Sequence, residues 1–251
     1  MTCTFLLETA EGAHVAFPRE GVQNRRMGRL RLVGAAGGAV FTILIVVAFA
    51  IALGPSSAAD VKVIDYYTAH GNAAIWQAVL GGFGIVGFIW FAAVFSGWSP
   101  AGPAVLISAA AMAALYSVTL GSWETLGENF KGVDVIDVSS ATYRDAHFLY
   151  DVGVGAAHMA LFMDAAFVGA TTAALFTTAV PRQRLGAIGI VLTLVFLVNA
   201  PLQIFGTAHW TDAVGTVVFL VLLAWVFVLS IVLVVSLRRE AAVAPVAAAP
   251  G

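Results

Sequence analysis

The sequence predicts an all-α fold, a polytopic bundle of about six transmembrane helices. Hydrophobic residues make up 61% of the 251-residue chain and charged residues only 10%, whereas soluble domains average about 25% charged residues. Six apolar runs reach the length of about twenty residues that an α-helix needs to cross the hydrocarbon core. The runs are continuously apolar and lack the period-two alternation of a membrane β-barrel.

The six predicted spans form one transmembrane domain, residues 32–237. Their approximate limits are 32–53, 72–95, 103–123, 152–176, 185–206 and 213–237. Glycine, alanine and β-branched residues dominate these spans, and small residues let helices approach closely in lipid. An N-terminal segment, residues 1–31, precedes the domain. The tail, residues 238–251, is rich in alanine and proline, which predicts disorder.

Two alternatives remain open for where the mature protein starts. Met27 begins a stretch, MGRLRLVGAAGGAVF, that would be a more ordinary start for a membrane protein than Met1. The span could also be a signal sequence cleaved after the small residues Ser57–Ala59. Its apolar region of about 21 residues is longer than the 7–15 of a signal sequence, so we favour a retained helix.

Basic residues near the span ends predict the orientation. They flank the first span, lie between the fourth and fifth spans and follow the sixth: Arg19, Arg25, Arg26, Arg29, Arg31, Arg182, Arg184, Arg238 and Arg239. With six spans these three segments fall on one side, and cytoplasmic segments are rich in Lys and Arg. Both termini are therefore predicted to be cytoplasmic, in the plasma membrane of a bacterium. The second cytoplasmic connection, SGWSPAG at 96–102, adds no positive charge.

The fourth span is predicted to belong to a helix that starts well outside the bilayer. Ser139 or Ser140 can cap it, and no proline or glycine interrupts residues 140–152 of the long outer connection, 124–151. The spacing of His147, Asp151 and His158 places them on one face of this helix. We expect it to be the longest element and to carry a polar stripe down from the outer surface.

Asp164 is the single charged side chain in any predicted span. An ionised group at the bilayer centre costs from about 2.5 to more than 10 kcal/mol, which makes such a residue a functional hypothesis with a partner to be found. No span contains a Lys or Arg. We therefore expect the neutral acid, facing other helices and hydrogen-bonded to a polar group.

Depth along the spans suggests partners for Asp164. The residues near its level are Thr42, Trp225 and Asn199, with Tyr116 and Ser117 somewhat further outward. Pro201 removes a helical hydrogen bond from the carbonyl group of Leu197. A kink at 197–201 beside Asp164 would form a polar pocket.

Other polar residues gather near the outer boundary of the predicted bundle. The candidates for proton-linked chemistry or ligand binding are Asp164, His158, Asp151, His147, Asn199, Gln77 and Glu124. A divalent metal could take His147, Asp151, His70 and His209 as ligands, because imidazole and carboxylate groups bind such ions. The sequence contains neither HxxxH nor HExxH, and Cys3 is its one cysteine. We therefore predict no cofactor, with the metal as an alternative.

Two stretches of the second helix resemble a known group of proteins. VIDYYTAHGN at 63–72, followed by GFIWFAAVF at 87–95, is similar to segments of uncharacterised multi-pass membrane proteins of actinobacteria. The resemblance implies a multi-pass topology and implies no activity.

Three hypotheses for function follow from these residues. We favour a protein that is not an enzyme and that carries out proton-linked transport or ligand binding through an outward-facing polar cavity. The alternatives are an intramembrane metal-dependent lipid hydrolase and a non-catalytic membrane subunit or sensor. The expected partners are the lipid bilayer, a small molecule or proton, and a protein partner or second copy. A net charge of -2 gives no basic surface for nucleic acid.

Overall fold

The computed structural model describes residues 20–52, 60–133, 139–177, 180–205 and 209–243. These residues form six α-helices: α1 (Glu20–Ile51), α2 (Asp60–Ser96), α3 (Gly102–Phe130), α4 (Ser140–Phe176), α5 (Val180–Phe205) and α6 (His209–Val243). Each helix is long and apolar enough to cross a membrane. The prediction of an all-α bundle with six spans is confirmed.

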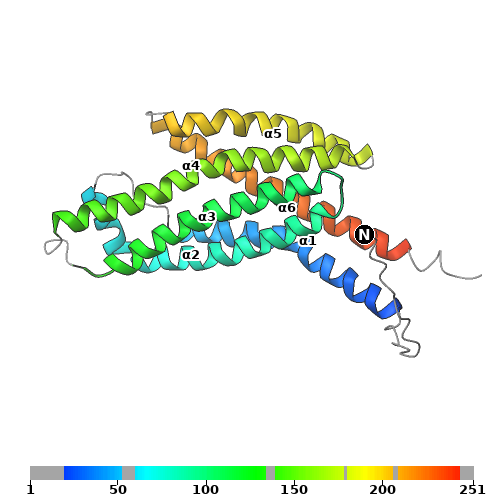
Figure 1. Ribbon diagram of the computed structural model, residues 1–251, viewed down its shortest axis with the longest axis horizontal. Coiled ribbons are helices and arrows are strands. Elements are labelled where there is room, and N and C mark those ends of the chain that lie inside the picture. The colour runs from blue at the N-terminus through cyan, green and yellow to red at the C-terminus, as the bar shows by residue number, and fades with distance from the viewer. Residues whose placement is uncertain (1–19, 53–59, 134–138, 178–179, 206–208, 244–251) are drawn as a thin grey trace, which may run out of the picture.

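The helices run alternately up and down the long axis of the molecule (Figure 1). Each helix from α1 to α4 packs on the next one along the chain, and α6 packs on α1. The α5–α6 pair makes far fewer contacts than the other consecutive pairs. The first described residues of α1 and the last of α6 lie at the same end of the bundle, which we call the terminal end. The opposite end is called the distal end.

The main core lies in the middle of the bundle and receives buried side chains from all six helices. Aromatic rings join three of them. Phe88 of α2 has its ring centroid 4.9 Å from that of Phe41 in α1 and 5.0 Å from that of Phe167 in α4. Such tilted and edge-on arrangements are the favoured ones for aromatic pairs. These contacts hold α1, α2 and α4 together.

A second core lies at the distal end, where α2, α3 and α4 extend beyond α5 (Figure 1). Its buried residues are Val63, Ile64, Tyr67 and Ala74 of α2, Leu126 and Phe130 of α3, and Ala146 of α4. Burying these side chains stabilises helical turns beyond the apolar spans. For this reason α2 begins at Asp60, twelve residues before the predicted span, and α3 continues to Phe130.

The second core also corrects two sequence predictions. We expected α4 to be the longest element, but α2 and α4 both contain 37 residues. We described residues 124–151 as a long connection, but 124–130 belong to α3. The predicted start of the fourth helix within this connection is confirmed, because α4 begins at Ser140. The predicted cap is confirmed, because the Ser139 side chain accepts a hydrogen bond from the backbone N–H of Thr142 at 3.2 Å.

Glycine pairs allow the closest helix crossings. A Cβ atom on Gly37 of α1 would overlap the carbonyl oxygen of Gly87 in α2, and one on Gly87 would lie 2.9 Å from the Gly37 oxygen. Gly71 of α2 and Gly127 of α3 make the same reciprocal approach, at 2.6 and 2.7 Å. Small residues at such crossings let backbones pack directly in lipid.

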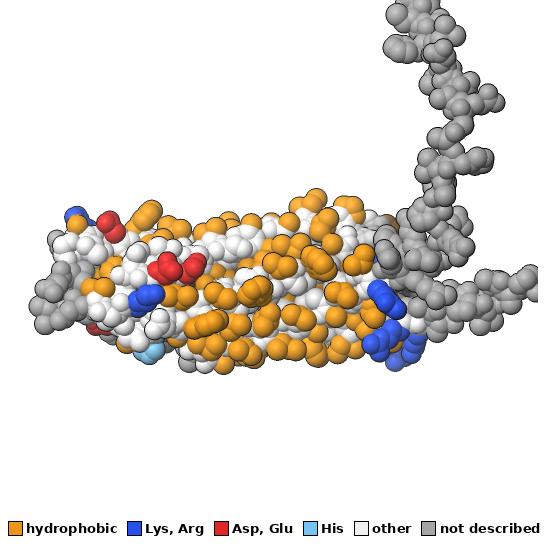
Figure 2. All heavy atoms as spheres, turned by 90° about the horizontal axis from the view of Figure 1, so that it is seen from below, with side chains coloured by type: hydrophobic (Ala, Val, Ile, Leu, Met, Phe, Trp, Pro, Cys, Tyr) orange, Lys and Arg blue, Asp and Glu red, His pale blue; other side chains and the backbone are white. Residues whose placement is uncertain are grey.

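Charged side chains occupy the two ends of the molecule, with a broad apolar belt between them (Figure 2). Exposed arginines lie at the terminal end, including Arg29 and Arg31 of α1 and Arg238 and Arg239 of α6. The acidic side chains visible in this view lie towards the distal end.

Several sequence predictions fall outside the described residues and stay predictions. They concern residues 1–19, Ser57–Ala59, the tail at 244–251 and the side chain of His209.

Candidate functional site

Asp164 lies in the middle of α4 with its side chain completely buried. The Tyr116 hydroxyl of α3 donates a hydrogen bond to its Oδ2 atom at 2.9 Å. The expectation that this carboxyl group faces other helices is confirmed. The tyrosine ring also packs against Phe219 of α6, with the ring centroids 5.9 Å apart.

The second carboxyl oxygen of Asp164 is the unusual feature of the site. Oδ1 is buried and has no hydrogen-bond partner among the described residues. Buried polar atoms almost always have a partner, so each exception calls for an explanation. The site therefore offers one oxygen held by Tyr116 and one oxygen that can take a proton or accept a hydrogen bond.

Two of the three residues that the sequence places at the level of Asp164, Thr42 and Trp225, have other partners in the structure. Thr42 donates to the carbonyl oxygen of Leu223 at 3.1 Å. The indole N–H of Trp225 donates to the Thr171 hydroxyl, also at 3.1 Å. Counting residues along a span gives the depth of a side chain but not the direction in which it points. The actual partner is Tyr116, which the sequence placed somewhat further outward.

Tyr116 belongs to a line of polar residues where α3 packs on α4. Tyr116, Thr119 and Trp123 follow each other at intervals of three and four residues, which places them on one helix face. Thr119 donates to the carbonyl oxygen of Gly153 at 3.0 Å, and Gly153 packs against Ser122 and Trp123. We call these five residues, together with Asp164, the α3–α4 seam. The spacing of Tyr116, Thr119 and Trp123 in the sequence is the signal that predicts a polar face on α3.

The seam contains a second buried polar atom without a partner. The indole Nε1 of Trp123 finds no acceptor among the described side chains and backbone groups. Trp123 contacts Gly153 in the distal half of α4, and Asp164 lies 11 residues further, about 16 Å along the helix axis. A donor and an acceptor without described partners therefore lie about 16 Å apart in the same interface.

The predicted polar stripe lies on the distal part of α4. His147 Nε2 is 3.0 Å from Asp151 Oδ2, with the two side chains 33% and 55% exposed. His158 is half-buried and lies seven residues, about two helical turns, beyond Asp151. It is six residues from Asp164, about 9 Å along the helix axis. The stripe therefore leads from the distal surface towards the level of the buried acid.

The remaining candidates lie apart from Asp164. Gln77 is buried and donates to the carbonyl oxygen of Ala52 at 3.2 Å, which satisfies a backbone group at the end of α1. Glu124 is half-buried on α3. His70 is exposed, stacks on the Tyr66 ring and has its Nδ1 atom 3.1 Å from the Tyr66 carbonyl oxygen.

The described residues contain no group of three or more His, Cys, Asp or Glu side chains that could hold a metal ion. His209, one of the four predicted ligands, has a side chain outside the described part. The metal site stays a prediction.

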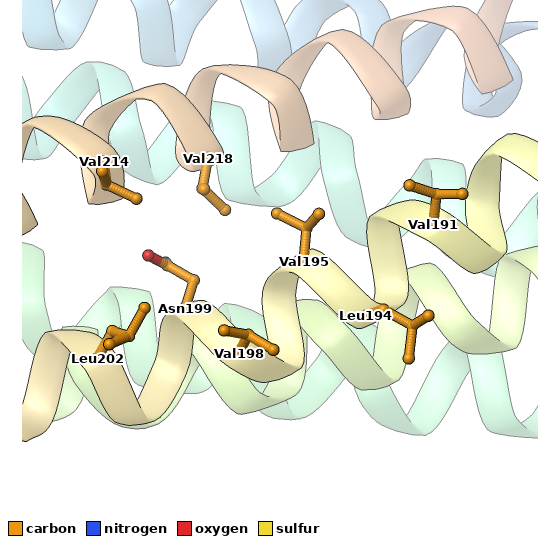
Figure 3. Close-up of a pocket in the computed structure, with 8 residues that line it drawn as sticks. All are labelled: Val191, Leu194, Val195, Val198, Asn199, Leu202, Val214 and Val218. Carbon is orange, nitrogen blue, oxygen red and sulfur yellow. The ribbon is translucent and has the colours of Figure 1, made fainter.

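Asn199 lies in a different environment from the one we expected. Its Oδ1 atom accepts a hydrogen bond from Gln203 at 3.1 Å, and its side chain faces α6 across a groove (Figure 3). Seven of the eight residues that line the groove are valine or leucine, and Asp164 is not among them. The predicted polar pocket shared by Asn199 and Asp164 is therefore wrong. Helix α5 continues through Pro201 to Phe205.

No family model, curated protein or solved structure matches the chain. The chemistry of the site therefore rests on its own geometry. A carboxyl group and a phenol in hydrogen-bond contact can exchange or hold a proton, and intramembrane acids serve in proton relays.

Proposed function

We propose that this integral membrane protein carries out proton-linked transport and moves protons across the membrane, with Asp164 as the group that gains and loses the proton. The observation that carries the proposal is the buried Asp164 carboxyl group, whose Oδ2 atom is held by Tyr116 and whose Oδ1 atom has no partner in the described structure. Keeping such a group in a membrane is costly. A role in binding a proton accounts for that cost.

The chemistry of the pair supports proton exchange. No Lys or Arg lies in any of the six predicted spans, so a proton is the simplest partner that can neutralise the carboxylate. The Tyr116 hydroxyl can donate to Oδ2 while a proton binds at Oδ1. In this arrangement Tyr116 holds the carboxyl group in place during loading and release.

The α3–α4 seam provides a route between Asp164 and the distal surface. Thr119, Ser122 and Trp123 supply hydroxyl and indole groups along it, and bound water can satisfy buried polar groups of this kind. The stripe of His147, Asp151 and His158 continues on α4 towards the distal end. We assign this end to the outside of a bacterial plasma membrane, because the exposed arginines at the terminal end favour the cytoplasm.

Proteoliposomes with a pH-sensitive dye inside would test the proposal. An imposed pH gradient should collapse faster with the protein than in empty vesicles. Asp164→Asn removes the titrating group with little change in size and should return the rate to that of empty vesicles. Tyr116→Phe should slow the collapse, because the carboxyl group loses its anchor. Asp145→Asn, at an exposed acid near the start of α4, is the matched control and should behave as wild type.

Two results would contradict the proposal. The first is a wild-type protein that moves protons no faster than empty vesicles. The second is an Asp164→Asn variant that reconstitutes equally well and keeps the wild-type rate.

A further inference from the structure

Exposed arginines gather at the terminal end of the neighbouring helices α1 and α6. They are Arg29 and Arg31 of α1 and Arg238 and Arg239 of α6, and Figure 2 shows basic side chains beside the apolar belt at this end. The described side chains of residues 28–42 and 223–239 include no Asp or Glu, and the same is true of the terminal half of α2. The described surroundings therefore do not neutralise this positive charge. A guanidinium group matches the geometry of a phosphate.

Arg29 and Arg238 lie at nearly the same height on two antiparallel helices that pack on each other. The Ser230 hydroxyl of α6 donates to the carbonyl oxygen of Ala35 in α1 and accepts from the backbone N–H of Ala39. Arg29 precedes Ala35 by six residues, about 9 Å along the axis, and Arg238 follows Ser230 by eight residues, about 12 Å. The two arginines therefore differ in height by about 3 Å.

Each of these two arginines ends an apolar stripe that faces the lipid. On α1, Val33 and Val40 share a face with Arg29 and are 57% and 47% exposed. On α6, Ile231 and Val235 share a face with Arg238 and are 47% and 42% exposed. All four apolar side chains lie within candidate membrane spans. A ligand that uses both the arginines and the stripes must be amphipathic.

The two stripes lie on the same side of the α1–α6 pair. Each is turned by roughly 120° from the contact between Ala35 and Ser230, counted in the chain direction. Equal turns on antiparallel neighbours bring both stripes to one side. Gly34, which packs on Val94 of α2, is turned by about 100° in the opposite sense, so α2 covers the other side.

We propose that the terminal end of the α1–α6 pair binds an anionic phospholipid. Arg29 and Arg238 contact the headgroup phosphate, and the acyl chains lie along the two apolar stripes. Basic sites between membrane helices bind anionic lipid headgroups in this way. The stripes directly beside the arginines favour a phosphate that carries acyl chains over a soluble one. The site lies apart from Asp164, so it can be tested independently of proton movement.

Native mass spectrometry of the purified full chain, titrated with dioleoyl phosphatidylglycerol or dioleoyl phosphatidylcholine, would test the site. Wild type should bind phosphatidylglycerol more than tenfold more tightly, since each basic side chain near a membrane surface contributes about fivefold. Arg29→Gln and Arg238→Gln should each weaken phosphatidylglycerol binding about fivefold and leave phosphatidylcholine binding unchanged. Arg184→Gln is the matched control. It removes an exposed arginine of α5, on the far side of the bundle from α1 (Figure 1), and should bind as wild type.

Dihexanoyl phosphatidylglycerol distinguishes a lipid from a soluble phosphate. It has the same headgroup with chains too short to follow the stripes, and it should bind more than tenfold more weakly than the dioleoyl lipid. Equal binding of the two dioleoyl lipids by wild type would overturn the proposal. So would equal losses in Arg29→Gln and Arg184→Gln, because affinity would then follow net charge. Displacement of the dioleoyl lipid by inorganic phosphate, but not by chloride at the same ionic strength, would show a soluble ligand instead.

Discussion

The α3–α4 seam and the α5–α6 groove are two helix interfaces in the same membrane domain. Each contains a buried polar side chain with one atom that has no hydrogen-bond partner in the described part of the chain. In the seam the helices pack closely, and Asp164 contacts Tyr116 from the neighbouring helix. In the groove the helices pack weakly, and Asn199 is held by Gln203 of its own helix. The seam is closely packed and contains polar side chains, whereas the groove is open and apolar.

The difference shows how packing determines what a buried polar group can bind. In a closed interface no space remains beside the polar atom for more than a proton or a water molecule. In an open interface the helices leave a volume that a large apolar molecule can fill. Two residues of similar size, Asp164 and Asn199, therefore lie in different surroundings.

The largest effect is expected where the seam is tightest. A Cβ atom on Gly153 would lie 3.0 Å from Ser122 Cβ and 3.2 Å from Trp123 Nε1. Gly153→Leu should therefore lower the free energy of unfolding in mixed micelles by about 2 kcal/mol or more, because overpacking forces neighbouring side chains or backbone to move. Gly155→Leu is the control, since a Cβ atom there meets nothing within 4 Å. Equal losses in both variants would show that the seam is not closely packed.

A smaller effect is expected from the hydrogen bond of the seam. Tyr116→Phe leaves both oxygens of Asp164 without a described partner and should cost about 1–3 kcal/mol of unfolding free energy. The double variant Tyr116→Phe with Asp164→Leu should recover most of this loss, because both polar partners are then gone. The four unfolding free energies of this double-mutant cycle measure the coupling. A coupling near zero would mean that the hydrogen bond contributes nothing to folding.

The fold could be predicted from the sequence to a large extent, and the helix ends could not. Apolar runs of about twenty residues require membrane helices almost regardless of context. The extra turns of α2 and α3 depend on Tyr67, Leu126 and Ala146, which meet only after three helices have packed. The residues of this distal core are scattered over three helices, so no continuous apolar run in the sequence indicates the extra turns.

The burial of Asp164 could likewise be predicted, because a charged group in lipid must face protein. Its partner could not be derived from depth alone. The rotation of α3, which brings the Tyr116 hydroxyl to the acid, is set by packing between helices. The groove could not be predicted from the sequence, because the weak packing of α5 on α6 depends on how all six helices pack together. Asn199 was recognised from sequence, but it was assigned to the wrong neighbour.

The smallest effect is expected in the groove, where the same substitution can be compared with one in the core. Val198→Leu adds a methylene group at a position that is 60% exposed beside an open volume. It should change the unfolding free energy by no more than about 0.5 kcal/mol, as surface substitutions usually do. Val168→Leu makes the identical change at a completely buried position of α4 and should cost about 1–3 kcal/mol.

The two valine variants distinguish an open groove from one that closes in the membrane. If α5 and α6 moved together in lipid, Val198→Leu would be as costly as Val168→Leu when unfolding is measured in bilayer-like bicelles. A small effect of Val198→Leu in both micelles and bicelles means that the groove stays open. An open groove keeps an apolar volume between α5 and α6 accessible from the hydrocarbon region.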